Sequence, residues 1–460
     1  MTFPLPTPME WRESAQKALK DRPLESLIHL DADHLTVRPL YGDATGIQPI
    51  FAPRSSDADG RAWDLRTPVE GEDAEAVNAA VLTDLEGGAA SVLISGAVTT
   101  DAGLLARALD GVALELAAVA LDAGLNGPAA ADALAAAAKG APRAKLALHL
   151  DPVSAFAQAG GADRPLTDYL AETAACAVRH AETYPDASLF LASGCVVHEA
   201  GGSAAQELGF AAASAIALID AAVEAGLPVE RALSGVVLGV SVDQTYFDAL
   251  AKVRALRLIW KTLSGAYGHE TPAVIEARSS RRMLAARDPW PNLLRLTAAG
   301  FAGAVGGADV VMLDGFTRAL GRPDAFARRQ ARNTQIVLME EANLGRVDDP
   351  AAGSWFLDSR THDLATAGWG EAQRIAREGG LIASLEGGAI QSRVAAARAA
   401  WLAAFADGRD QIIGVTKYVD PEVRPAPVEA TFEAAAPKPA VAIAALPPVR
   451  AAASFEEASA

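Results

Sequence analysis

Short apolar runs of strand length alternate with longer segments of helical periodicity between about residue 85 and residue 400. Nearly continuous apolar runs are typical of strands that are buried on both faces of a parallel sheet. Such runs occur at residues 90–95, 145–150, 188–192, 235–241, 273–277 and 309–313. This alternation predicts an α/β fold in which crossover helices join parallel strands. By itself it leaves a choice between a doubly wound sheet and an eight-stranded barrel.

Several helical segments carry clear start and end signals. Ser203 and Gln206 have the spacing of a capping box, and the helix that they open should end before Gly226. Further helices are expected at residues 10–19, 288–306, 323–341 and 361–378.

Another helix is predicted by an apolar stripe at helical spacing. The stripe consists of Tyr246, Leu250, Val253, Leu256, Trp260 and Leu263. Arg254, Arg257 and Lys261 line up beside it. A row of charges on a helix is usually solvated, so we expect these three side chains on the surface, with binding to a partner as the alternative.

Composition restricts the class of protein. The chain has 460 residues, 51% of them hydrophobic, which is enough for a large core. Its formal net charge of −17 argues against a nucleic-acid or anionic-membrane partner, since either requires a basic surface. Two cysteines provide no disulfide framework and favour a reducing compartment. The first residues lack the features of a secretory signal, and we expect a cytoplasmic protein.

Four segments in the second half of the chain carry a family resemblance. They begin with the sequences Arg-Asp288-Pro-Trp-Pro-Asn, Gly306-Gly-Ala-Asp, Ala331-Arg-Asn-Thr-Gln and Gly345-Arg-Val-Asp-Asp-Pro-Ala-Ala-Gly-Ser-Trp. Together they resemble the adenosylcobalamin-dependent acyl-CoA mutases, and most of all the small (beta) subunits of methylmalonyl-CoA mutase. The resemblance extends from Pro39-Leu-Tyr-Gly to Gly414-Val-Thr-Lys-Tyr.

The resemblance implies a (β/α)₈ TIM-type barrel and thereby decides between the two α/β folds. It implies an N-terminal arm at residues 1–46 that contacts a partner, an acyl-CoA mutase-type barrel at 47–420, and an Ala/Pro-rich linker or disordered tail at 421–460. The two barrel strands not yet placed are expected near residues 112–116 and after Gly345. We expect the cobalamin-binding domain to be absent, because no Asp-x-His-x-x-Gly element occurs.

Several positions that react with substrate in the catalytic members of the family are changed in this chain. Their Ser-Gly-Tyr-His element, whose Tyr and His contact the migrating acyl group, matches Ser193-Gly194-Cys195-Val196. Valine can neither donate a proton nor form a hydrogen bond with a thioester carbonyl. A glutamine of the family's site matches His149, and the family's His-x-x-Thr-Ser-Gly begins here with Glu276.

A fourth changed segment lies near the start of the expected barrel. The family's Pro-Tyr-x-x-x-Tyr-x-x-Arg-x-Trp keeps Pro53, Arg61 and Trp63, whereas its two tyrosines are replaced by Arg54 and Ala58. We therefore expect a retained scaffold without catalytic residues, with Ala58, His149, Cys195, Val196 and Glu276 at the degenerate positions.

The resemblance implies the small, non-catalytic subunit of a heterodimeric methylmalonyl-CoA mutase. The partner large subunit would hold adenosylcobalamin and isomerise methylmalonyl-CoA to succinyl-CoA, while this chain alone would bind no cofactor or metal. Two alternatives remain open. One is a catalytic barrel that works with a separately encoded cobalamin-binding subunit, and the other is an acyl-CoA-binding assembly protein.

Three other sites can be drawn from residue types alone. Cys195 and His198 could act as nucleophile and base, and with Cys176 and His180 they make four possible zinc ligands. Gly201-Gly202-Ser203 before a helix could hold a phosphate. Each pattern is more often purely structural, and we expect that outcome for all three.

Overall fold

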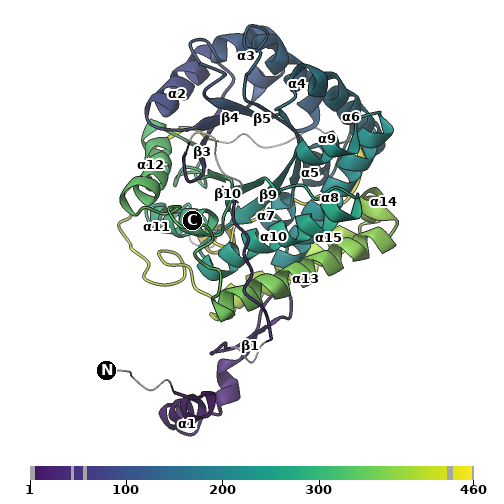
Figure 1. Cartoon of the computed structure of the whole chain (residues 1–460). Coiled ribbons are helices and arrows are strands. Elements are labelled where there is room, and N and C mark those ends of the chain that lie inside the picture. Colours follow the sequence, from purple (N-terminus) through teal and green to yellow (C-terminus); the bar gives the residue numbers. More distant parts are fainter. Residues whose placement is uncertain (1–5, 43–45, 55–59, 432–438, 458–460) are drawn as a thin grey trace.

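Eight parallel strands close into a barrel surrounded by helices, as a computed structural model of the chain shows (Figure 1). The structure describes residues 6–42, 46–54, 60–431 and 439–457. The barrel strands are β3 (Asp64–Glu70), β4 (Ser91–Ser95), β5 (Ala118–Asp122), β6 (Leu146–Leu150), β8 (Ser188–Ser193), β9 (Val236–Val242), β10 (Ile275–Ser279) and β11 (Val310–Met312). They are arranged in this order, and β11 closes the barrel by pairing with β3. The predicted TIM-type barrel is confirmed.

All six apolar runs form barrel strands, but both predictions for the remaining two strands were wrong. The strand expected at 112–116 lies slightly later, as β5, and the segment after Gly345 leads into a helix. The missing strand is β3, near the start of the chain. Its Asp64, Arg66 and Pro68 interrupt the apolar pattern, and proline argues against a central strand. Pro68 lies beyond the residues of β3 that pair with β11.

The helices surround the barrel (Figure 1). The long ones are α2 (Ala74–Glu86), α4 (Gly127–Ala137), α6 (Leu166–Thr183), α8 (Ala204–Glu224), α10 (Tyr246–Ala266), α11 (Asn292–Val305), α12 (Ala325–Ile336), α13 (Trp355–Arg377) and α15 (Ala389–Ala406). Shorter ones are α3 (Ala102–Ala108), α5 (Pro152–Ala159), α7 (Cys195–Glu199), α9 (Val229–Ser234) and α14 (Gly380–Glu386). The capping box of Ser203 and Gln206 is confirmed. The helix expected from 361 begins earlier, because Ser354 caps α13.

Helix α8 packs closely against α13. A Cβ atom on Gly368 of α13 would lie 2.7 Å from the Cβ atom of Leu208, so only glycine permits this approach. Among the described residues, α8 is the one helix whose length and composition would suit a membrane span, but 67% of its apolar window is buried in the fold. Such burial is typical of a core helix in a globular protein.

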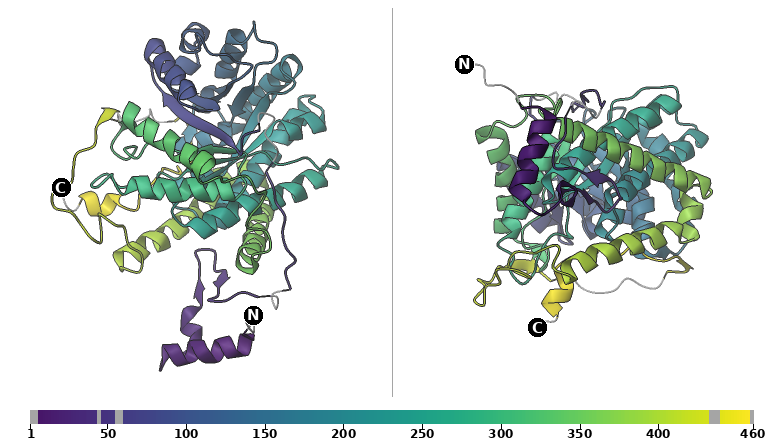
Figure 2. Two further views of the ribbon diagram at one scale, coloured as in Figure 1. Left: turned by 60° about the vertical axis from the view of Figure 1, so that its left-hand side comes forward. Right: turned by 90° about the horizontal axis from the view of Figure 1, so that it is seen from below.

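An N-terminal arm projects from the barrel and consists of α1 (Pro8–Leu19) and the hairpin of β1 (His29–Leu30) with β2 (Thr36–Val37). Helix α1 has no buried residue and stands apart from the barrel in Figure 1 and in the left view of Figure 2. The base of the arm is anchored by two carboxylates. Asp31 forms an ion pair with Arg360, and Asp33 accepts a hydrogen bond from the Ala205 amide at 3.0 Å.

The expected surface row of basic residues is mostly buried, so that prediction was wrong. Arg254 is fully buried and forms ion pairs with Asp349 at 3.0 Å and Asp358 at 2.9 Å, and of the three basic residues only Lys261 is exposed. Arg257 forms an ion pair with Asp309 at 2.9 Å. The sequence pattern alone did not show that the loop before α13 covers this part of α10.

The described parts of the C-terminal segment lie against the barrel. Its short strands β13 (Val428–Ala430) and β14 (Val441–Ala442) pair with β12 (Arg322–Pro323) and β7 (Gly161–Ala162). Backbone amides of Leu446, Val449 and Ala451 then donate to carbonyls of Ala157, Glu199 and Arg282, in segments that follow β6, β8 and β10. These contacts bring the described part of the segment to the C-terminal ends of the strands.

Candidate functional site

The C-terminal ends of the strands are where barrel proteins of this type carry their active sites. Here β8 ends in Ser193 and passes directly into α7, which begins at Cys195. Gly194 makes this turn possible, since a Cβ atom would overlap the backbone oxygen of Glu207. Val196 is 5% exposed and presents only methyl groups. Burial raises the pKa of Cys195 to about 11, so its sulfur is a protonated thiol at neutral pH.

Cys195 and His198 do not pair as nucleophile and base. His198 Nε2 lies 2.9 Å from Ser280 Oγ, and its Nδ1 lies 3.2 Å from Glu207 Oε2. Both ring nitrogens are therefore engaged away from the thiol. Ser280 and Glu207 are fully buried, so this arrangement is closed to a substrate.

The interior of the barrel holds a buried ion network centred on Glu276. Its carboxylate accepts hydrogen bonds from Arg66 at 2.5 Å and from Arg278 at 2.6 Å, and His149 Nε2 lies 3.7 Å away. Burial alone would raise the pKa of Glu276, but the charges of the two arginines outweigh it and hold that pKa well below its usual range. The Glu276 carboxylate thus stays ionised and accepts hydrogen bonds from both arginines.

Strand geometry explains why these side chains meet. Residues two apart in a strand point to the same face, and this places Asp64 with Arg66 and Glu276 with Arg278. Arg66 also donates to Ser91 Oγ at 2.8 Å and to Asp64 at 3.1 Å. Arg278 reaches Asp122 of β5 at 3.3 Å. The network therefore links β3, β4, β5 and β10 across the barrel.

His149, at the end of β6, is part of the same network. Burial lowers its pKa to about 3, so its ring is neutral at physiological pH. Its φ of 47° is left-handed, a conformation that a residue with a side chain adopts only when its surroundings impose it. A small apolar layer of Leu93, Ala120, Ala147 and Met312 also occupies the barrel.

Of the degenerate positions expected from the sequence, the structure brings His149 and Glu276 together and places Cys195 and Val196 on α7. Ala58 lies outside the described residues. Sequence reasoning missed Arg66, because strand β3 had not been recognised. The alternation of Asp64, Arg66, Pro68 and Glu70 with less polar residues was the available signal.

The retained part of the Pro53 to Trp63 segment is structural. Trp63 is buried and its indole N–H donates to Gln335 at 3.0 Å. Arg54, which stands where the family has tyrosine, lies over the Trp63 ring at 5.6 Å and donates to the carbonyls of Ala62 and Ala304. The arginine side chain thus tethers this segment to the barrel.

A second buried network clamps the turn after β8. Glu207 of α8 accepts from Lys252 at 2.5 Å and from the Ser241 amide at 2.6 Å, beside His198. Burial opposes ionisation of Glu207, but the charge of Lys252 and the contact with His198 lower its pKa to about 2. Burial and the nearby cations Arg282 and Lys252 lower the pKa of His198 to about 4. The network joins α7, α8, β9 and α10.

Acid should destabilise the protein partly through His198. Its pKa is about 4 in the fold and about 6.5 in the unfolded chain, so the unfolded chain binds the proton first as pH falls. The stability that depends on the neutral ring is present above pH 6.5 and is lost down to pH 4, by up to roughly 3 kcal/mol. His198→Gln should flatten the fall in melting temperature between pH 7 and pH 4.5. The same change at the exposed His29 should leave it unaltered.

The two other patterns of residue types do not form sites either. At the start of α8, after Gly201-Gly202, the Ala205 amide donates to the Asp33 carboxylate and the Gln206 amide donates to Ser203 Oγ, so these amides are not free for a phosphate. The four possible zinc ligands do not assemble. Cys176 and His180 lie on α6 beside Asp132 of α4, whereas His198 is bound to Ser280 and Glu207.

The barrel and its interior define the class of protein: a (β/α)₈ barrel crossed by buried ion pairs. The chain belongs to the methylmalonyl-CoA mutase family, whose model matches residues 95–456. It is 38% identical to the methylmalonyl-CoA mutase small subunit of Streptomyces virginiae, over 92% of this chain and 70% of that protein. It is 32% identical to the small subunit of Propionibacterium freudenreichii subsp. shermanii, over 82% of this chain and 63% of that protein.

A more distant relative is the methylmalonyl-CoA mutase of Escherichia coli, 26% identical over 89% of this chain and 64% of that protein. The chain spans between 58% and 70% of the length of the curated relatives it matches.

Proposed function

We propose that the chain is the small, non-catalytic subunit of a heterodimeric methylmalonyl-CoA mutase. The large subunit would carry adenosylcobalamin and the acyl-CoA and would interconvert methylmalonyl-CoA and succinyl-CoA. This chain would support that subunit by packing against it. On the grounds of its cysteine content, we propose that the complex is cytoplasmic.

The ion network inside the barrel is the observation that carries the proposal. An axial route for a long acyl-CoA chain requires space along the barrel. Here Arg66 of β3 and Arg278 of β10 both donate to Glu276, at 2.5 and 2.6 Å, and Arg278 also reaches Asp122 on the opposite strand β5 at 3.3 Å. Opening the barrel would separate charges that are buried, which is costly. Arg66 and Glu276 are thus held by protein groups in the interior of the barrel.

The residues at the end of β8 support the same reading. A rearrangement of an acyl group needs hydrogen-bond donors that stabilise the thioester oxygen in the transition state. Val196 has no donor, and Cys195 has a weak one. The histidines of this region do not fit a cobalt ligand either. His198 has both ring nitrogens engaged, and His149 is buried among the ion pairs. We therefore derive no chemical step through cobalamin on this chain.

Reconstitution tests the proposal directly. The purified chain and its large subunit should elute together in size-exclusion chromatography. The mixture should show higher mutase activity or a higher melting temperature than the large subunit alone. Separate elution, with no change in either quantity, would contradict the proposal.

Substitutions at the end of β8 separate this role from a catalytic one. In the reconstituted complex, Cys195→Ser and Val196→Ala should leave turnover within about twofold, because neither side chain meets substrate. A catalytic barrel served by a separate cobalamin-binding subunit predicts a large loss for at least one variant, and activity from this chain with a cobalamin carrier. Tight binding of CoA to the isolated chain in calorimetry would instead favour an acyl-CoA-binding assembly protein.

A further inference from the structure

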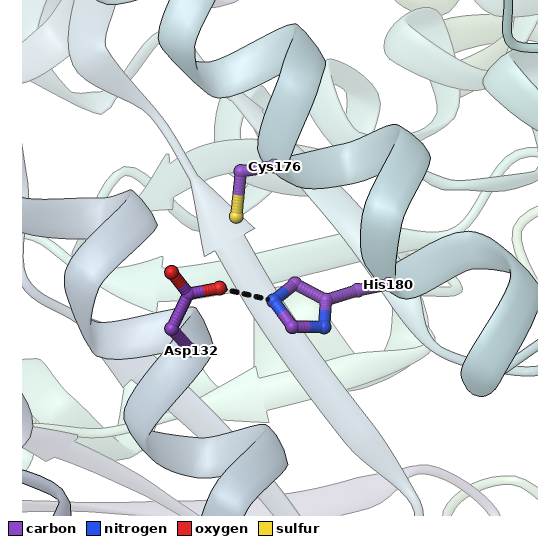
Figure 3. Close-up of side chains that lie close together, drawn as sticks. All are labelled: Asp132, Cys176 and His180. Atoms are coloured by element: carbon purple, nitrogen blue, oxygen red, sulfur yellow. Dashed lines mark hydrogen bonds and ion pairs between the residues drawn. The ribbon is translucent and has the colours of Figure 1, made fainter.

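Three potential metal ligands meet on the outside of the barrel, between α4 and α6. Cys176 and His180 are one helical turn apart on α6, and Asp132 faces them from α4 (Figure 3). One ligand atom from each residue lies within 4.8 Å of the other two. His180 Nε2 and Asp132 Oδ1 are 2.6 Å apart. This cluster takes no part in the networks at the barrel mouth.

The chemistry of the three side chains suits zinc. A thiolate, an imidazole and a carboxylate are all common zinc ligands, and sites with three protein ligands complete their tetrahedron with water. Side chains four residues apart share a helix face, which lets Cys176 and His180 bind one ion. Solvent reaches one side of the cluster, because the Asp132 side chain is 53% exposed while Cys176 is fully buried. A zinc ion bound by the buried sulfur would thus keep a water on its solvent-exposed side.

Small side-chain movements would form the site. Zinc–ligand bond lengths place neighbouring donor atoms about 3.3–3.6 Å apart, so His180 and Asp132 would separate by under 1 Å. The Cys176 sulfur has only a 3.8 Å contact with the Pro128 carbonyl to lose. Arg179 lies 3.1 Å from both Asp132 oxygens and would orient the carboxylate as an outer partner of the ion.

We propose that Asp132, Cys176 and His180 bind one Zn²⁺, with water as the fourth ligand, and that the ion joins α4 to α6. On binding, the Cys176 thiol gives its proton to solvent and its sulfur bonds to the metal as a thiolate, without any redox change. The site is independent of the proposed role in a mutase complex. It does not require the partner subunit.

Cobalt(II) and zinc titrations of the purified full-length chain test the proposal. Cobalt(II) should bind at one ion per chain and produce the thiolate-to-cobalt charge-transfer absorption, which zinc should then abolish by displacement. Zinc should also raise the melting temperature. Cys176→Ser should remove the absorption band and weaken zinc binding by at least about 10- to 100-fold. Asp132→Asn, which keeps the size of the side chain, should weaken binding over a similar range.

Cys195→Ser is the matched control, because it removes the other cysteine of the chain and should leave the band and the affinity unchanged. Circular dichroism of each variant without metal checks that it is folded. Lack of stoichiometric binding by the native chain would overturn the proposal. So would a cobalt band that persists in Cys176→Ser or disappears in Cys195→Ser.

Discussion

Replacing Glu276 with alanine is expected to lower the free energy of unfolding by about 3–5 kcal/mol, because Arg66 and Arg278 lose the carboxylate that they share. Glu276 is fully buried. The other partners of the arginines, Asp64 and Asp122, are 22% and 49% exposed and compensate them less well. Urea denaturation followed by tryptophan fluorescence measures the change.

A second variant separates charge from shape at position 276, and a variant of an exposed glutamate is the control. Glu276→Gln keeps the size of the side chain but removes its charge, so it should also destabilise the fold, though less than alanine. Glu386→Ala removes an exposed carboxylate and should change stability by no more than about 0.5 kcal/mol. If Glu276→Ala resembled this control, the barrel interior would be open enough for water to solvate the arginines. That result would remove the main support for a non-catalytic barrel.

Parallel strands could be predicted from the sequence because most of them are apolar on both faces, and the family resemblance then favoured a closed barrel. Strand β9, from Val236 to Val242, is buried at every position and stands out as a continuous run. Strand β3 was missed for the opposite reason. Its inward-facing residues Asp64 and Arg66 are charged, and the pairing of Arg66 with Glu276, more than 200 residues away, is a tertiary effect. Local pattern cannot reveal such a partner.

The candidate site, too, could be predicted from the sequence only in part. Changed residues such as Val196 and Glu276 could be recognised because the segments around them resemble the family. The contacts of Glu276 and of the turn after β8 could not be recognised, since the partners Arg66, Lys252 and Ser280 are distant in sequence. The basic residues on α10 were predicted to be exposed, and this prediction was wrong for Arg254. Arg254 looked like a surface charge because its two carboxylates follow about one hundred residues later.

Arg254→Met should therefore destabilise the protein by about 3–5 kcal/mol, because it leaves the buried carboxylates of Asp349 and Asp358 without their cation. The guanidinium also donates to the Ile50 carbonyl at 2.7 Å and to Thr361 Oγ1 at 3.0 Å. Its loss would release the segment before the barrel and the loop before α13 together. Thermal and urea denaturation of the purified variant measure the effect.

Lys261→Met is the matched control, because it removes an exposed cation from the same helix and should shift stability by no more than about 0.5 kcal/mol. A double variant tests whether charge or packing is responsible. Asp358→Asn removes one orphaned charge and keeps an oxygen for the Gly353 amide, so Arg254→Met with Asp358→Asn should cost less than the sum of the two single changes. Strict additivity would mean that the arginine acts through its volume alone. The segment before the barrel, around Ile50, would then be held by packing, with little contribution from this ion pair.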